Sequence, residues 1–346
     1  MALQQAPHPH PPDPAPDGRR VPLVAVVVTH NRLAHLRITL DRLLASPASL
    51  LAAVVVVDNL SDDGTGPWLG AQADPRLVVL HPDRNLGGAG GFEAGMRLAM
   101  ERFDPDWLVV MDDDARPDPG ALAAFAAMDR TGWEALAAAV HYPDGRICAM
   151  NRPWQNPFRQ PLRRLAGRLT GRGLAHMGRA DYAPGAAVRA VDGASFVGLF
   201  LSRAAIARAG YPDGRLFLYA DDGLYTLGLT QAGGPLGFAP ALRFEHDCST
   251  FSGAPGRFTP LWKAYYYYRN MLMFHRRCAG PWFWPALLVL VPKWLMKARR
   301  HPGQGRVFLR LLGLALADGL ARRTSRPHDQ VLAHAGAQAI APPRVP

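Results

Sequence analysis

Three consecutive aspartates, Asp112, Asp113 and Asp114, follow an apolar stretch that runs from Trp107 to Met111. Adjacent carboxylates repel each other unless a positive charge lies between them. A divalent metal ion would supply that charge, because such ions prefer carboxylate oxygens and often bridge to phosphates. A solvated acidic turn is the other interpretation, and the triplet by itself does not choose between the two.

Polar residues also follow two earlier apolar stretches. The first stretch ends in Thr-His-Asn-Arg at residues 29–32 and the second in Asp58-Asn59. Neighbouring strand ends of this kind form crevices that hold nucleotides. An aspartate there can accept hydrogen bonds from a base or ribose, and an arginine can bind phosphate. The candidate nucleotide-binding residues are Thr29, Asn31, Arg32, Asp58 and Asn59, although Asp63-Gly64-Thr65 just beyond is also common turn chemistry.

A glycine run, Gly-Gly-Ala-Gly-Gly at residues 87–91, follows Arg84 and Asn85 and precedes a helical pattern. Glycine lets a ligand approach the backbone closely and tolerates positive φ, and a helix start favours anions. Gly87, Gly88, Gly90 and Gly91 are therefore candidates for contact with a diphosphate or sugar. A tight turn between strand and helix is the alternative.

Two later features add candidate catalytic groups. Asp221 and Asp222 begin a helical stretch, where one carboxylate could deprotonate a hydroxyl or simply cap the helix. His246 closes the apolar stretch 238–244. Imidazole is a common transition-metal ligand, whereas a single histidine is often structural.

The elements that must position these residues alternate between strand and helix patterns. This alternation predicts an α/β fold with a mostly parallel, doubly wound sheet. The predicted strands are residues 21–29, 53–57, 76–80, 107–111 and 196–201, and the predicted helices include 33–44 and 93–102. Regularity is lost between 142 and 190.

Composition divides the chain further. Residues 1–20 are rich in proline and lack the continuous apolar region that a signal peptide contains, which predicts a disordered tail and not a signal peptide. We expect a catalytic domain over 21–252, a basic aromatic helical segment over 253–327 and a tail over 328–346, with the boundary near Ser252 to Phe258. The three cysteines, Cys148, Cys248 and Cys278, lie far apart, which indicates neither a disulfide framework nor a zinc site and fits a reducing compartment.

The net charge of +11 belongs to one segment. Between Leu261 and Pro327 lie thirteen of the 39 basic residues and one of the 28 acidic residues, a local net charge of +12. No nucleic-acid-binding module accompanies these charges, so no nucleic-acid partner is expected. Trp282 to Val291 is apolar, yet far shorter than the ~20 residues that span a bilayer. With the basic residues that follow, it suits an interfacial segment on an anionic membrane, or a packed helical subdomain.

Together the motifs resemble the GT-A glycosyltransferases of family 2, especially the bacterial galactofuranosyltransferases and rhamnosyltransferases. The resemblance runs from Pro22 to Phe251 and keeps the family's order of motifs. It implies that Asp112 and Asp114 face a Mn²⁺ or Mg²⁺ ion and the nucleotide diphosphate, with Asp113 supporting and His246 as a further metal ligand. It also implies that Asp222, or else Asp221, is the catalytic base.

The resemblance implies further binding roles and one departure. Arg32, Asp58, Arg84 and Asn85 would position the nucleotide, and Trp154 in the irregular region could offer a stacking surface for an acceptor. Leu224 and Gly228 stand where many relatives carry an acid and an arginine, which puts acceptor recognition in that region in doubt.

The implied activity is metal-dependent inverting transfer from UDP-galactofuranose, or alternatively dTDP-rhamnose, to a hydroxyl of a glycan or polyprenyl-linked acceptor in cell-wall or polysaccharide assembly. We expect a cytoplasmic enzyme at the inner face of the cell membrane and leave its oligomeric state open. A sugar-nucleotide pyrophosphorylase would need a glycine-rich loop with a lysine after the first strand, which residues 29–32 lack. A catalytically inactive sugar- or lipid-binding module would not need the intact set of Asp112, Asp114, Asp222 and His246.

Overall fold

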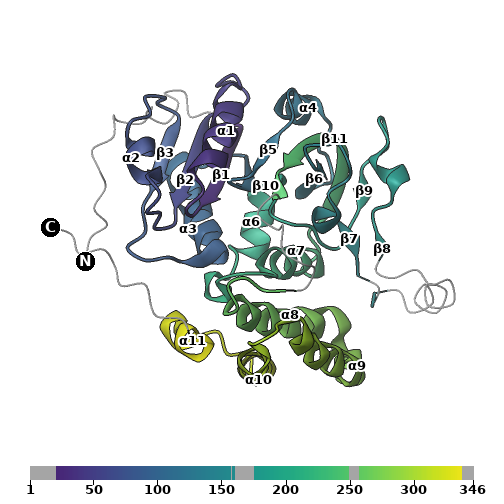
Figure 1. Ribbon diagram of the computed structural model, residues 1–346. Helices are drawn as coiled ribbons and strands as arrows, with labels where there is room; N and C mark the ends of the chain where they lie inside the picture. The colour runs from purple at the N-terminus through teal and green to yellow at the C-terminus, as the bar shows by residue number, and fades with distance from the viewer. Residues whose placement is uncertain (1–20, 157, 160–174, 249–256, 337–346) are drawn as a thin grey trace. The chain divides into compact units, whose positions relative to one another are not determined.

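The computed structural model describes residues 21–156, 158–159, 175–248 and 257–336 (Figure 1). The predicted N-terminal tail, and most of the predicted domain boundary, lie outside these ranges. The chain divides into two compact units. Of the described residues, one unit contains those up to Gly214 together with Asp222–Cys248, and the other contains Arg215–Asp221 together with those from 257 onward.

A nine-stranded sheet forms the centre of the first unit, with the order β3-β2-β1-β4-β10-β6-β11-β5 and β9 paired to β11. Its strands are β1 (Leu23–Thr29), β2 (Ala53–Asp58), β3 (Leu77–Leu80), β4 (Trp107–Asp112), β5 (Ala115–Pro117), β6 (Ala135–His141), β9 (Arg189–Ala190), β10 (Leu199–Ser202) and β11 (Leu236–His246). A separate pair joins β7 (Trp154–Gln155) to β8 (Ala175–His176).

The helices of this unit are α1 (Leu33–Leu44), α2 (Thr65–Gly70), α3 (Gly87–Phe103), α4 (Ala121–Ala127), α6 (Arg203–Ala209) and α7 (Asp221–Gln231). Three short 3-10 turns also lie in the chain before α7: η1 (Ala149–Asn151), η2 (Arg179–Tyr182) and η3 (Gly214–Leu216). The α/β fold is as predicted. The sheet is mixed, however, because β10 runs antiparallel to both β4 and β6.

The parallel half of the sheet sets the position of the polar strand ends. Strand β1 pairs in parallel with β2 on one side and with β4 on the other. The register places Thr29 beside Asp58 and Val28 beside Asp112. The first two polar strand ends and the aspartate triplet therefore meet at one edge of the sheet, as expected for ligand sites in open α/β folds.

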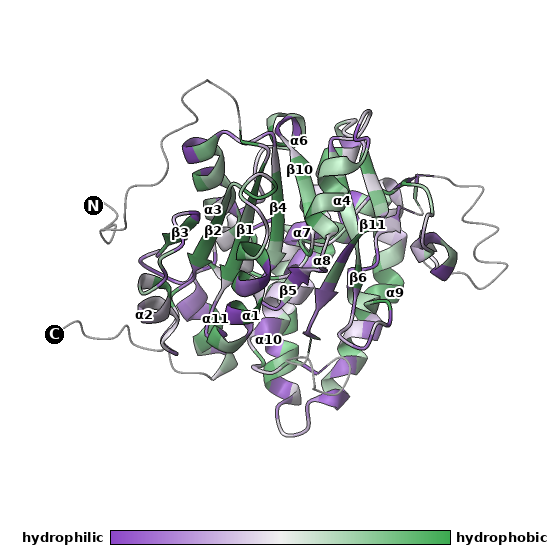
Figure 2. Cartoon of the chain, turned by 90° about the horizontal axis from the view of Figure 1, so that it is seen from above, coloured by the Kyte–Doolittle hydropathy of each residue, from purple (hydrophilic) through white to green (hydrophobic). Residues whose placement is uncertain are grey.

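The core lies on both faces of this sheet because strand side chains alternate with a period of two. Val26 and Val28 of β1 pack in the cluster that includes Met96 of α3. Val27 packs on the other face, in the cluster that includes Leu36 of α1. Figure 2 shows most of β1, β2 and β4 as hydrophobic, which is typical of a sheet covered by helices on both faces.

The second unit contains α8 (Lys263–Ala279), α9 (Phe283–Met296), α10 (Gly305–Leu320) and α11 (His328–Ala335), with 3-10 turns at Gly280–Trp282 and Lys297–Arg300. Residues 328–335 were expected to be a tail, and they form α11 instead. Val331 is fully buried and the Tyr266 hydroxyl lies 2.9 Å from His328 Nδ1, which fastens this helix to α8. Within the residues that the structure describes, no helix combines the length and apolarity needed to cross a bilayer.

Candidate active site

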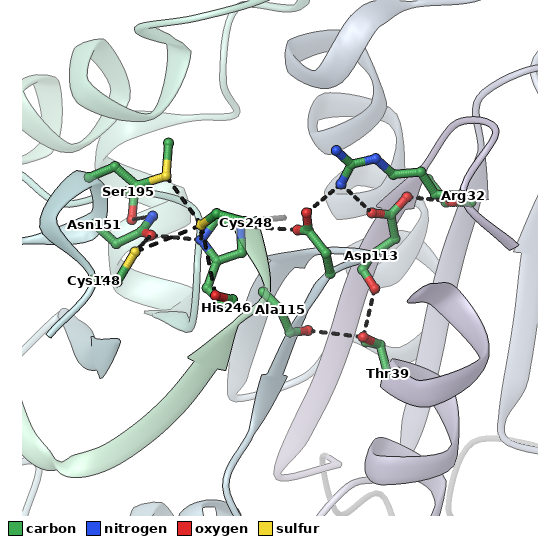
Figure 3. Close-up of polar contacts among 12 residues, drawn as sticks. Arg32, Thr39, Asp113, Ala115, Cys148, Asn151, Ser195, His246 and Cys248 are labelled. Carbon is green, nitrogen blue, oxygen red and sulfur yellow. Dashed lines mark hydrogen bonds and ion pairs between the residues drawn. The ribbon is translucent and has the colours of Figure 1, made fainter. Parts of the chain in front are cut away.

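Asp113 is held from three sides. Strand β4 ends at Asp112, and the two aspartates that follow are buried. The Thr29 hydroxyl donates to the Asp113 carboxylate at 2.7 Å, and Arg32 Nη1 lies 3.3 Å from its other oxygen. The Thr39 hydroxyl of α1 donates to the Asp113 carbonyl at 2.6 Å (Figure 3). These contacts give Asp113 a supporting position, which anchors the triplet to β1 and α1.

Asp114 connects the triplet to His246, at the end of β11. One carboxylate oxygen lies 3.0 Å from His246 Nε2, and the other pairs with Arg32 Nη1. The possible ligand atoms of Asp112, Asp114 and His246 all lie within 4.8 Å of one another. Two carboxylates and an imidazole form a donor set that suits Mn²⁺ and tolerates Mg²⁺. The residues therefore fit a divalent ion.

The pKa values at this site show how strongly the carboxylates need a positive charge. Burial raises the pKa of Asp112 to about 7, and the charge of Asp114 adds to the effect. Burial also raises the pKa of Asp113 to about 6, against the opposing charge of Arg32. At Asp114 burial acts in the same direction, but hydrogen bonding to His246 and the charge of Arg32 outweigh it and lower the pKa.

The imidazole of His246 responds in the opposite sense. Burial would lower its pKa, yet the hydrogen bond and charge of Asp114 prevail and raise the pKa to about 10. The pocket thus stabilises positive charge at the point where the three side chains converge. A bound cation would meet the same field.

Asn151, in the 3-10 turn η1, orients the imidazole. Its Oδ1 lies 2.7 Å from His246 Nδ1, and its Nδ2 donates to the Ser195 hydroxyl at 2.8 Å. Because an amide oxygen accepts, Nδ1 carries a proton in this contact. In the absence of a metal Nε2 also carries a proton, which it donates to Asp114, and a metal ion bound at Nε2 would replace that second proton. Sequence reasoning missed Asn151 and Ser195, since neither belongs to a regular motif.

At the predicted nucleotide crevice, the side chains of Asp58 and Asn31 form hydrogen bonds with the loops that follow β2 and β3. Asp58 is buried and accepts from the backbone N–H of Ser61 at 3.1 Å, with His81 Nδ1 at 3.3 Å. Burial raises the pKa of Asp58, but the bonds to His81 and Ser61 outweigh it and lower the pKa. Asn31 accepts from the N–H of Asp62 at 2.7 Å. The loops that follow β1 and β2 are therefore hydrogen-bonded to each other.

Asn59 and Asn85 hold the start of α3. Asn59 accepts from the N–H of Leu86 at 2.7 Å and donates to the carbonyl of Gly87 at 2.9 Å. Asn85 accepts from the N–H of Gly87 at 2.8 Å. Both side chains are engaged with backbone here, so their role in this structure is to position the glycine run. The neighbouring Arg84 is exposed.

The glycine run is the first turn of α3, which begins at Gly87 and not near Glu93 as predicted. Gly87 has a φ of +69°. A Cβ on Gly91 would lie 2.6 Å from Val28 Cγ1, and one on Gly90 would lie 2.7 Å from Leu86 Cβ. The structure thus gives Gly90 and Gly91 a packing role that the sequence did not reveal, while Gly87 and Gly88 open the helix.

Asp221 and Asp222 begin α7, and both are half-buried. The carboxylate of Asp222 accepts from the N–H of Gly223 at 2.6 Å. Burial raises the pKa of Asp222 to about 6, although the backbone N–H groups oppose the effect. A carboxylate with a raised pKa near the start of a helix is suited to accept a proton.

A hydrogen-bond chain connects α7 with the His246 network. The Thr226 hydroxyl donates to the carbonyl of Asp222 at 2.8 Å and accepts from the N–H of Ala194 at 3.2 Å. Ala194 precedes Ser195, which accepts from Asn151. The first turn of α7 and the imidazole are therefore fixed through the same short segment, residues 194–195.

Within the second unit, Arg269 and Asn270 of α8 hold residues 215–220, the loop that leads into α7. Asn270 Nδ2 lies within 3.0 Å of three loop carbonyls, and Arg269 Nη2 donates to the carbonyl of Leu216 at 2.7 Å. The loop needs this support because Phe217, Tyr219 and Ala220 all have positive φ.

Trp154 pairs with the segment that precedes Ala194. Its backbone N–H donates to the carbonyl of Gly193 at 3.0 Å. The indole ring packs directly on Gly193, because a Cβ added to Gly193 would lie only 2.1 Å from Trp154 Cζ2. The ring is half-buried, so part of its surface is taken by protein.

Comparisons with known proteins identify the family of this chain. The family model described as glycosyl transferase family 2 matches residues 24–177. The galactofuranosyltransferase GlfT1 of Mycolicibacterium smegmatis is 30% identical over 229 residues, which are 65% of this chain and 71% of that protein. Galactofuranosyltransferase GlfT1 of Mycobacterium tuberculosis is 32% identical over 233 residues, 65% and 70% of the two chains.

Among solved structures, a crystal structure of GalNAc-T7 with UDP, GalNAc and Mn²⁺ is similar in fold. The TM-score is 0.53 at 12% sequence identity, and the match covers 92% of this chain and 55% of that chain. At 12% sequence identity this similarity supports a shared fold and nothing more specific.

Proposed function

Because the chain belongs to glycosyl transferase family 2, a family of glycosyltransferases with the GT-A fold, we propose that it transfers a sugar from a nucleotide diphosphate donor with inversion and with a divalent metal ion. The observation that carries this proposal is the convergence of Asp112, Asp114 and His246 beside the crevice at the ends of β1 and β2.

Asp112, Asp114 and His246 would hold Mn²⁺ or Mg²⁺, and Asp113 anchors the triplet without facing the ion. When bound, the ion neutralises charge on the leaving nucleoside diphosphate. Arg32 contributes a positive charge that already bridges Asp113 and Asp114. The crevice residues Thr29, Asn31, Asp58 and Arg84 would bind the nucleotide, and Gly87 and Gly88 would face the donor at the N-terminus of α3.

Asp222 is the proposed base. Its carboxylate takes the proton of the acceptor hydroxyl while the hydroxyl oxygen forms a bond to the anomeric carbon and the diphosphate oxygen leaves with the electrons of the broken bond. A single displacement of this kind inverts the anomeric centre. Asp221 is the alternate base, and Asp222 is favoured because burial raises its pKa to about 6.

UDP-galactofuranose is the favoured donor, because the two relatives that share about two thirds of the chain are named galactofuranosyltransferases. The alternative donor is dTDP-rhamnose. The proposed acceptor is a hydroxyl of a glycan or polyprenyl-linked glycan in cell-wall or polysaccharide assembly, with Trp154 as a candidate contact. A catalytically inactive binding module is the rival of another class.

The donor class is tested by thermal shift with UDP, UDP-galactofuranose, dTDP-rhamnose and GDP-mannose, each with and without Mn²⁺. A nucleotide that binds the native state raises the unfolding temperature. We expect stabilisation by the UDP compounds, stronger with Mn²⁺. Stabilisation by dTDP-rhamnose alone would move the donor to the alternative, and a metal-independent response would contradict the metal site.

Turnover then separates enzyme from inactive module. Asp114→Ala should lower transfer by at least about a hundredfold, as loss of a group that stabilises developing charge commonly does. The matched control is Asp41→Ala, which removes an exposed carboxylate of α1. Undiminished turnover in Asp114→Ala would remove that residue from the site.

We also propose that helix α9 lies on an anionic membrane at the cytoplasmic face. Six apolar side chains of α9 and the residue before it are between 46% and 79% exposed: Trp282, Trp284, Leu288, Val289, Leu295 and Met296. With about 100° per residue, those in the helix form one stripe, opposite the buried Phe283 and Trp294. Four basic residues between 293 and 300 give the end of the stripe a charge complementary to anionic lipid.

A further inference from the structure

Two thiols lie on the Nδ1 side of His246, away from Asp114. Cys248 Sγ is 3.2 Å from His246 Nδ1, and Cys148 Sγ is 3.9 Å from Cys248 Sγ. Cys148 directly precedes the turn η1, and Cys248 follows β11 by two residues. The ligand atoms of the three side chains all lie within 4.8 Å of one another (Figure 3).

The spacing matches a tetrahedral metal site. Two sulfurs at the usual 2.3 Å from one tetrahedral Zn²⁺ are about 3.8 Å apart, close to the 3.9 Å that separates Cys148 Sγ from Cys248 Sγ. A disulfide would need the same atoms about 2 Å apart. Thiolate and imidazole ligands favour Zn²⁺ over the harder Mg²⁺ and Mn²⁺.

We propose that Cys148, Cys248 and His246 Nδ1 form a second metal site, selective for Zn²⁺, with a solvent or exogenous ligand in the fourth position. Binding releases the two thiol protons to solvent. The proton that Nδ1 donates to Asn151 is also released, while Nε2 keeps the proton that it donates to Asp114, so the ring becomes neutral and the two thiolates balance the charge of Zn²⁺.

The two sites share one imidazole and therefore exclude each other. A neutral imidazole offers a single nitrogen lone pair. When Nδ1 holds Zn²⁺, Nε2 carries the proton and points it at Asp114, so His246 leaves the set that would bind Mn²⁺ or Mg²⁺. Zinc then acts as an inhibitor that competes with the catalytic ion; this consequence rests on the proposed function, whereas the zinc site itself does not.

Binding is measured on the full chain after reduction and metal removal, by titrating Zn²⁺ against a chromophoric chelator. We expect one tight equivalent, and at least about tenfold weaker binding in Cys148→Ser and in Cys248→Ser. Cys278→Ser is the matched control, because that cysteine lies in α8. Co²⁺ in place of Zn²⁺ should give the thiolate-to-metal absorption that carboxylate sites lack.

Three results would overturn the proposal. One is tight binding that survives in both cysteine variants, which would assign zinc to the carboxylate site. Another is a Co²⁺ spectrum without thiolate absorption. The third, once Mn²⁺ binding to the protein has been measured directly, is a zinc affinity that saturating Mn²⁺ does not weaken, since the shared imidazole requires competition. If the protein binds zinc in this way but transfers no sugar, the proposed function fails and the zinc site stands.

Discussion

At the scale of single residues, burial decides what each aspartate does. Asp113 accepts bonds from Thr29 and Arg32 and is a structural anchor. The charges of Asp112 and Asp114 repel at short range in a poorly solvated pocket, which contributes to the raised pKa of Asp112 and would favour a shared cation. Asp222 lacks a cationic partner among the causes that set its pKa, and this suits a proton acceptor.

The pH dependence of transfer should report Asp222. Its folded-state pKa of about 6 lies above the ordinary 3.8, so the carboxylate is protonated and inactive at lower pH. We expect kcat at pH 5 to be about a tenth of that at pH 8, and Asp222→Asn to lose transfer at every pH. Rate measurements at saturating metal between pH 5 and 8 check this.

The same shift predicts the sign of the stability effect. A carboxyl whose pKa is raised on folding stabilises the native state below its unfolded pKa and loses that contribution as pH rises through about 6. Asp222→Asn should therefore unfold at a temperature no lower than wild type at pH 7.5. A clear drop in the unfolding temperature of Asp222→Asn would show that the carboxylate has a structural role. For comparison, we expect Asp221→Asn to keep a normal transfer rate.

Asn151 should tune the metal site through His246 without touching the ion. Loss of its bond to Nδ1 frees the imidazole to rotate and change tautomer, and such changes cost 10–100-fold in metal affinity. We expect Asn151→Ala to weaken Mn²⁺ binding by about that factor, measured by titration calorimetry. Ser195→Ala, one bond further away, should have a smaller effect; equal affinities in all three proteins would contradict this role.

At the scale of elements, close packing of α3 on β1 fixes the nucleotide crevice. Helix α3 approaches β1 because Gly91 and Gly95 leave room for Val28 and Val26. The same helix receives Asn59 at its start. A change in helix position would therefore move the glycine run, the crevice and the aspartate triplet relative to one another.

Gly91→Ala tests that packing. Its Cβ would lie 2.6 Å from Val28 Cγ1, an overlap that costs about 1–3 kcal/mol in a packed core. We expect a lower unfolding temperature and weaker nucleotide binding. Gly70→Ala in α2, where nothing lies within 4 Å of the added Cβ, should leave both unchanged. Normal stability in Gly91→Ala would show that the helix can shift freely.

At the scale of the whole molecule, the positive charge is concentrated in one segment of the sequence. The segment from Leu261 to Pro327 carries a net charge of +12, while the rest of the chain carries −1. This segment also contains α9 with its exposed apolar stripe. Basic and apolar residues in one helical unit are typical of proteins that lie on anionic membranes.

Vesicle flotation tests this surface. The full chain should float with vesicles that contain anionic lipid, less with neutral vesicles, and less as salt rises and screens the charges. Trp284→Ser with Leu288→Ser should abolish flotation, whereas Ile38→Ser, which changes an exposed apolar residue of α1, should not. Failure to float, or self-association through α9 in solution, would contradict a membrane role.

The sequence by itself determined the parallel half of the sheet and the order of the motifs. Strands β1, β2 and β4 are continuous apolar runs, and each ends in polar residues. Such runs must be buried, and parallel strands bring their carboxyl ends together, so these polar residues were predictable as one site. The sequence did not reveal β6, whose four alanines carry little strand preference, or the antiparallel course of β10.

The tertiary structure decided which side chains that are distant in the sequence come into contact around His246. Asn151 and Ser195 reach His246 from irregular segments that no periodicity marks. Cys148 and Cys248, one hundred residues apart, meet because the chain returns to the same sheet edge through β11. Local pattern encodes which faces are buried, whereas contacts between loops depend on how the whole chain packs. The imidazole shared by the two proposed metal sites was therefore a candidate from sequence, whereas its neighbours were set by the fold.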